Sequence, residues 1–154
     1  MSLSKKVLST ILLVSATLLF PGLASAQNYP DSVKQHVGSV KKQVTTINIE
    51  QFKAAFDQKK LGLLVDVREP DEFAEGHIPG AINIPRGLIE FNIWTEVGYP
   101  DKTDVNKQIT LYCKTGGRCA LAAKSLKDLG FTNVTAADMK IEDWKKAGHP
   151  VAKM

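Results

Sequence analysis

The sequence predicts an α/β fold in which a mainly parallel central sheet carries helices on both faces. Two observations lead to this prediction. From Thr46 onward, short apolar runs alternate with apolar residues at helical spacing. The run over residues 63–65 is continuously apolar, as in a strand buried on both faces. With 44% hydrophobic and 23% charged residues, the composition excludes a disordered chain, a dense disulfide scaffold and a polytopic membrane protein.

Residues 1–26 predict an export signal. Lys5 and Lys6 precede an apolar stretch over residues 7–20, and small residues lead up to Ala26, as signal peptidase requires. The stretch is shorter than the roughly 20 apolar residues of a membrane span, although an uncleaved anchor is the alternative. We expect cleavage after Ala26 and a periplasmic or secreted protein without stable membrane association. Loss of the two lysines would lower the formal net charge from +4 to +2.

Residues 27–45 form an N-terminal extension with valines at helical spacing. Val33, Val37, Val40 and Val44 fall on one face of a helix, and lysines lie between them. We expect a short amphipathic helix at the edge of the domain. A partner-binding arm is the alternative interpretation.

Residues 46–154 are expected to form one domain of alternating strands and helices. The predicted strands lie near Ile47, over 63–65, 81–84 and 109–112, and near Val134. Five helices are predicted. They are one from about Ile49, one that opens at Pro70, one from about Leu88, one after the loop 113–118 and one that contains Trp144. Active sites in such sheets lie at the carboxyl ends of the strands, which is where Cys113 falls.

The chemistry is concentrated in the loop after the strand 109–112, which reads Cys113, Lys114, Thr115, Gly116, Gly117 and Arg118. The two glycines let the backbone curl with its N–H groups facing inward, and the next helix adds a partial positive charge. With full charges on Lys114 and Arg118, we expect a Cys113 thiolate, the nucleophilic form. The alternative is a buried structural cysteine followed by a glycine turn.

Motifs along residues 46–151 resemble the single-domain rhodaneses. The matching stretches are 64–69, 72–73, 76–81, 83–85, 112–113, 116–118, Trp144, 147–148 and 150–151. The resemblance implies a three-layer α/β sandwich that passes sulfane sulfur from a donor such as thiosulfate to a thiophilic acceptor, without a cofactor. It implies that Cys113 carries the sulfur as a persulfide and that residues 114–118 bind the anion.

The length of the loop separates this interpretation from a related one. Four residues lie between Cys113 and Arg118, whereas the related dual-specificity phosphatases and rhodanese-like arsenate reductases have five. By that resemblance, the shorter loop favours attack on sulfur. Basic residues such as Lys114 and Arg118 favour thiosulfate over mercaptopyruvate as the donor.

The chain departs from the family pattern where Met139 and Lys140 replace a glycine pair five residues before the tryptophan. The replacement puts the shape of the pocket in question. Lys140 either adds a third positive charge near the anion or points to solvent.

Cys119 is the second of the two cysteines. It is a possible redox partner of Cys113 in an oxidising compartment, or else a half-buried helix residue. A disulfide needs the two Cα atoms within about 7 Å, and we expect a cradle loop to hold its ends wider apart. Two alternative functions stay open. One is a thiol/disulfide redox protein that uses Cys113 and Cys119, and the other is a non-catalytic sulfur-binding module.

Two further residues are candidates for binding substrate. Asp66 ends a strand and could orient the loop amides or the substrate, and Arg86 could face the pocket entrance. We expect Arg68 and Glu72 to form an ion pair that holds the short helix, and His77 to hydrogen-bond the backbone of its turn.

The sequence gives no indication of several other ligands. The histidines and cysteines have no metal-ligand spacing, so no metal is expected. A nucleotide phosphate loop and a basic patch with interleaved aromatics are both missing, so we expect no nucleotide or nucleic-acid partner. The oligomeric state is left open.

Overall fold

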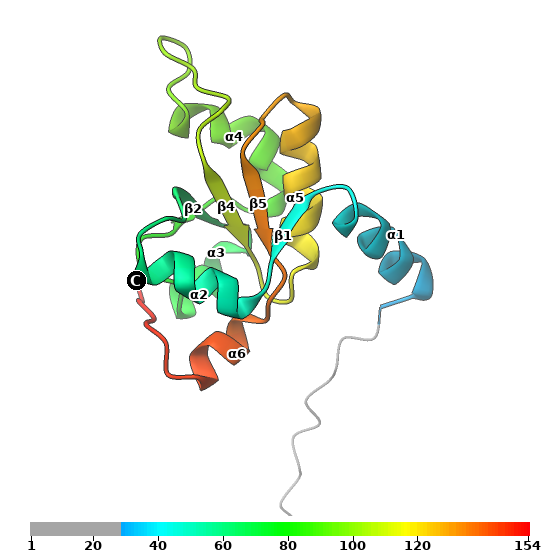
Figure 1. The fold of residues 1–154 in the computed structure, drawn as a ribbon, viewed down its shortest axis with the longest axis vertical. Coiled ribbons are helices and arrows are strands. Elements are labelled where there is room, and N and C mark those ends of the chain that lie inside the picture. Colours follow the sequence, from blue (N-terminus) through cyan, green and yellow to red (C-terminus); the bar gives the residue numbers. More distant parts are fainter. Residues whose placement is uncertain (1–28) are drawn as a thin grey trace, which may run out of the picture.

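The structure, a computed structural model, describes residues 29–154 as a parallel sheet with helices on both faces (Figure 1). The predicted α/β class is therefore confirmed. The predicted export signal, residues 1–26, lies outside the described residues. Within the described part, no helix is long and apolar enough to cross a membrane.

The sheet has five strands, all in parallel pairs, in the order β1-β5-β4-β2-β3. The strands are β1 Thr45–Ile47, β2 Leu63–Asp66, β3 Ile82–Asn83, β4 Ile109–Tyr112 and β5 Val134–Ala137. The four residues of β4 are all buried, because β2 and β5 flank this strand and helices cover it. The residue that follows β4 is Cys113, which therefore emerges at the centre of the sheet edge.

Helices divide the buried side chains into two cores. The helical elements are α1 Asp31–Lys41, α2 Ile49–Asp57, α3 Pro70–Glu75, the 3₁₀ helix η1 Arg86–Leu88, α4 Ile89–Glu96, α5 Gly117–Asp128 and α6 Ile141–Lys146. One core joins Ile93 of α4 and Leu126 of α5 to the sheet. The other joins Phe52 of α2 and Trp144 of α6 to the opposite face. Successive strand residues serve opposite cores, as Leu111 and Tyr112 do.

The N-terminal extension contains the helix that its valines predict, α1, and this helix lies beside α5 (Figure 1). Val40 is buried, and Val37 lies close to the backbone at Gly117. Lys41 at the end of the helix pairs with Asp138 at 2.5 Å. The extension is thus packed beside the loop that follows β4.

Candidate active site

Cys113 lies directly after β4, and only 1% of its surface is exposed. The loop reaches α5 through Gly116, which has a φ of +84° and stands at the N-cap of the helix. A Cβ at this position would come within 2.5 Å of Asp138 Oδ1. Glycine is therefore required twice here, for the left-handed backbone and for the space.

The surroundings of Cys113 favour its thiolate. The thiol of Cys119 is the largest cause that lowers its pKa, which falls to about 6. Burial opposes this shift, and backbone hydrogen bonds from Cys119, Thr115 and Gly116 support it. At pH 7 a group with this pKa is about nine-tenths ionised, so the sulfur is prepared as a nucleophile.

Cys119 lies in the first turn of α5 and is fully buried, so the expectation of a half-buried residue is wrong. Its Sγ lies 3.7 Å from Sγ of Cys113, and both cysteines are free. The loop therefore holds the two thiols closer together than the wide separation that we expected from the sequence. The hydrogen bond to Cys113, together with burial, raises the pKa of Cys119 well above its usual value. Cys119 thus remains protonated, and its thiol lies in hydrogen-bond contact with the Cys113 sulfur and with the carbonyl oxygens of Gly116 and Ala137.

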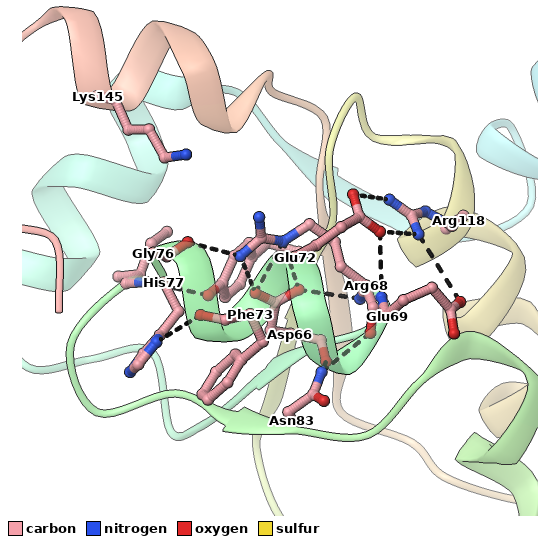
Figure 2. A network of polar contacts seen from close by, with 12 residues as sticks. Asp66, Arg68, Glu69, Glu72, Phe73, Gly76, His77, Asn83, Arg118 and Lys145 are labelled. Carbon is pink, nitrogen blue, oxygen red and sulfur yellow. Dashed lines mark hydrogen bonds and ion pairs between the residues drawn. The ribbon is translucent and has the colours of Figure 1, made fainter. Parts of the chain in front are cut away.

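Arg118 is oriented toward α3 (Figure 2). Its guanidinium donates to the two carboxylate oxygens of Glu72 at 2.7 and 2.9 Å, and Glu69 lies 3.9 Å away. These contacts raise the pKa of Arg118 and lower that of Glu72. Lys114 is exposed. The principal stabilisers of the sulfur are consequently a thiol and backbone amides, and not the two cationic side chains that the sequence suggested.

A cavity of about 740 Å³ adjoins the loop. Lys114, Thr115, Gly117 and Arg118 line it on the loop side. Helix α1 supplies an apolar wall that includes Val33 and Val37, and α3 adds Asp71 and Glu72. That α1 lines this cavity was not predicted from the sequence. The valine spacing predicted the helix, but nothing in the spacing told which surface the helix would cover.

Asp66 takes no part in the cavity. It is fully buried, and its carboxylate accepts hydrogen bonds from Nε and Nη2 of Arg68 at 2.6 to 3.0 Å (Figure 2). Arg68 Nη2 also donates to the carbonyl oxygen of Gly76. The predicted ion pair between Arg68 and Glu72 is therefore wrong, because Arg68 pairs with Asp66 and Glu72 pairs with Arg118. The substrate-binding role expected of Asp66 is likewise not supported by its position.

Arg86 also lies away from the cavity, contrary to expectation. Its guanidinium donates to Glu90 at 2.9 Å and to Ser125 Oγ at 3.0 Å, which ties η1 to α4 and α5. His77 hydrogen-bonds the carbonyl oxygen of Phe73 at 2.9 Å, as predicted (Figure 2). The imidazole also stacks on the ring of Phe73.

The residues that replace the family's glycine pair lead into α6, whose first residue bonds the loop. Met139 is buried and Lys140 is exposed at the N-cap of α6. The N–H of Ile141 donates to the carbonyl oxygen of Lys114 at 3.1 Å.

Among residues 29–154, no three His, Cys, Asp or Glu side chains gather in a metal-binding arrangement.

Known proteins resemble this chain in both sequence and fold. The family model for the rhodanese-like domain matches residues 48–147. The chain is 38% identical over 73 residues to thiosulfate sulfurtransferase PspE of Escherichia coli, covering 47% of this chain and 65% of that protein. It is 33% identical over 93 residues to thiosulfate:glutathione sulfurtransferase of Saccharomyces cerevisiae, covering 56% of this chain and 66% of that protein. The chain thus spans less than two thirds of the length of either relative.

A solved structure from Rhodopseudomonas palustris resembles the fold over more of the chain. It is 27% identical, with a TM-score of 0.67, and the match covers 82% of this chain and 98% of that one. That protein is of unknown function and is described as a possible tyrosine phosphatase.

Proposed function

The chain belongs to the family of rhodanese-like domains, and on that premise we propose that it moves sulfane sulfur from thiosulfate to a thiophilic acceptor through a persulfide on Cys113. The observation that carries this proposal is a buried cysteine at the end of a central strand, whose pKa of about 6 makes it a thiolate at neutral pH. Such a sulfur is a strong nucleophile, and the loop that begins with it lines a cavity of about 740 Å³.

The first half-reaction is a displacement at sulfur. The Cys113 thiolate attacks the outer sulfur of thiosulfate, the S–S bond of the donor breaks, and sulfite leaves with the bonding electron pair. The negative charge moves to the outer sulfur of the persulfide. The loop amides, of which those of Thr115 and Gly116 hydrogen-bond the Cys113 thiolate, are the groups proposed to stabilise it. In the second half-reaction the acceptor attacks this outer sulfur and the Cys113 thiolate is restored.

Two features support thiosulfate as the donor. Four basic side chains line the cavity against three carboxylates, and Lys114 and Arg118 are the two on the loop. Both relatives named above act on thiosulfate by their names. The loop also argues against phosphoryl transfer. Four residues separate Cys113 from Arg118, and a short cradle suits attack on a sulfur atom better than attack on a tetrahedral phosphate.

Intact-mass analysis tests the proposal. After incubation with thiosulfate, the protein should gain about 32 Da, the mass of one sulfur atom on the nucleophile. The gain should vanish in Cys113→Ser, which keeps the size of the side chain and should remain folded. Sulfite should appear in a 1:1 ratio with the adduct. A wild-type protein that gains no mass would indicate a non-catalytic binding module.

The distance of 3.7 Å between the two sulfur atoms favours a second candidate, a thiol/disulfide redox protein that cycles Cys113 and Cys119. The two candidates respond differently to Cys119→Ser. Thiol–disulfide exchange with a substrate disulfide should be abolished in this variant, whereas turnover of thiosulfate with cyanide should persist.

We also propose that the protein is exported to the periplasm or secreted. The support is the pattern of residues 1–26, a basic start followed by an apolar stretch and small residues. Fractionation of the native bacterium together with N-terminal sequencing tests this. A mature protein that begins at Gln27 outside the cytoplasm is expected, and an intact leader on a cytoplasmic protein would refute it.

A further inference from the structure

The thiol of Cys119 is held in contact with the sulfur that would carry the cargo. It lies on the inner side of the loop, where its Sγ is 3.3 Å from the carbonyl oxygens of both Gly116 and Ala137. The Sγ of Cys113 is 3.7 Å away. Because Cys119 is fully buried, it meets no external partner, and the reactive group within its reach is the sulfur of Cys113.

The proposed function places a sulfur–sulfur bond at this point. In the persulfide, Sγ of Cys113 becomes the inner sulfur, and a thiol in van der Waals contact with it is close to the separation of about 3–3.5 Å at which reacting atoms attack. We propose that Cys119 is a resolving thiol, which discharges the Cys113 persulfide as hydrosulfide when no acceptor is present. This inference rests on the proposed function.

The reaction balances without any further oxidant. Sγ of Cys119 forms a bond to Sγ of Cys113, and the bond between Sγ of Cys113 and the outer sulfur breaks. The bonding electron pair leaves with the outer sulfur, which takes the proton from Cys119 and departs as hydrosulfide. The sulfane sulfur is thereby reduced, and the two cysteines are oxidised to a disulfide. A dithiol reductant then restores both thiols.

The same contacts make this discharge slow. The attacking form of Cys119 is the thiolate, and burial and the neighbouring sulfur both disfavour it. An external acceptor that enters the cavity therefore takes the sulfur first. Without an acceptor, the pair ends as a disulfide, which protects Cys113 from further oxidation to the sulfinic acid.

The test is a single-turnover experiment without acceptor in oxygen-free buffer. Wild-type protein is loaded with thiosulfate, freed of excess donor and followed by intact mass. The adduct of about 32 Da should decay to a species about 2 Da lighter than the reduced protein, with one equivalent of sulfide released. Trypsin separates the two cysteines, because Lys107, Lys114, Arg118 and Lys124 flank residues 108–114 and 119–124. These two peptides should be found joined by a disulfide.

Cys119→Ser is the matched variant, since it keeps a hydrogen-bond donor of similar size. Its adduct should live at least about tenfold longer and release no sulfide. Equal adduct lifetimes in the two proteins, or decay without sulfide and without the linked peptides, would overturn the inference while leaving the persulfide mechanism intact. If neither protein forms the adduct, both proposals fail together. The linked peptides and released sulfide are measured on wild-type protein and so decide the question even if the variant misfolds.

Discussion

Two neighbouring strand ends of this sheet treat charge in opposite ways. At the end of β2, the full charges of Asp66 and Arg68 are buried and paired with each other. At the end of β4, the negative charge of Cys113 is also buried, but mainly a thiol and backbone amides stabilise it, and the charge of Arg118 adds less. The first arrangement leaves no charge free for chemistry, whereas the second keeps a reactive anion that can bond to a new atom.

The difference between the two strand ends has a physical basis. A buried ion pair is satisfied only while both partners remain, because removing one leaves an uncompensated charge. Amides and a thiol carry no full charge of their own, so when the charge moves from Cys113 Sγ to the outer sulfur of a persulfide no buried cation is left unpaired. Partial charges therefore suit the site that reacts, and full charges suit the site that fixes the fold.

The largest effect is expected at the end of β2. Arg68→Met should reduce the free energy of unfolding by about 3–5 kcal/mol, because it leaves the Asp66 carboxylate buried and unpaired. Urea unfolding measures this loss. Lys124→Met is the matched control, since its ion pair with Asp128 is partly exposed to solvent and should contribute under about 1 kcal/mol. Similar losses in the two variants would contradict the contrast between the strand ends.

The next effect concerns the turn of the loop at Gly116. Gly116→Ala adds a Cβ beside Asp138 in a left-handed backbone and should cost about 2–3 kcal/mol of stability. Gly80→Ala is the control, because Gly80 has a similar φ of +83° and open space around it. Its cost should be about 1 kcal/mol. The Gly116 variant should also lose most of its persulfide formation, measured by mass, while the Gly80 variant retains it.

A smaller effect is expected on the pKa of Cys113 when its thiol donor is removed. Cys119→Ala should raise this pKa from about 6 by about one unit, because a hydrogen bond to a charged group is worth roughly that much. The thiolate exists above the pKa, so alkylation by iodoacetamide should slow about fivefold at pH 6 and be unchanged at pH 9. Cys119→Ser, which restores a donor, should lie near wild type. If the alanine variant titrates like wild type, the amides alone hold the thiolate.

The sequence predicted the α/β class and the position of Cys113 because both follow from local patterns. A continuous apolar run marks a buried strand, and a cysteine followed by two glycines marks a strand-to-helix loop. The sequence could not predict which carboxylate each arginine would choose. Arg68 bonds a residue two positions away, whereas Arg118 reaches Glu72 on a distant segment. Such choices depend on how the strands are ordered in the sheet.

The role of Cys119 was hidden for a related reason. Its spacing from Cys113 was visible, but the curvature of the loop, set by Gly116 with its positive φ, decides whether the two sulfur atoms meet. Helix α1 was likewise predicted as a helix, yet its place beside the loop depends on tertiary contacts such as the ion pair between Lys41 and Asp138. Patterns along the chain identify elements, and contacts between elements complete the site.

The smallest effect is expected for the full charge at the rim of the cavity. Lys114 is exposed and lines the cavity beside the loop. Lys114→Gln should raise the KM for thiosulfate by about two- to fivefold, because an exposed charge attracts an anion through well-screened solvent. The kcat and the pKa of Cys113 should be unchanged. The effect should fade as ionic strength rises, since the Debye length falls to about 3 Å at 1 M salt.

Lys60→Gln provides the control for this last change, because Lys60 is equally charged and exposed but lies away from the loop and its cavity. Its KM should remain near that of wild type. A loss of kcat in Lys114→Gln, or a shift in the pH at which Cys113 reacts, would mean that the full charge acts on the sulfur itself. The contrast between the two strand ends would then fail, since β4 would also depend on a cation to hold its anion.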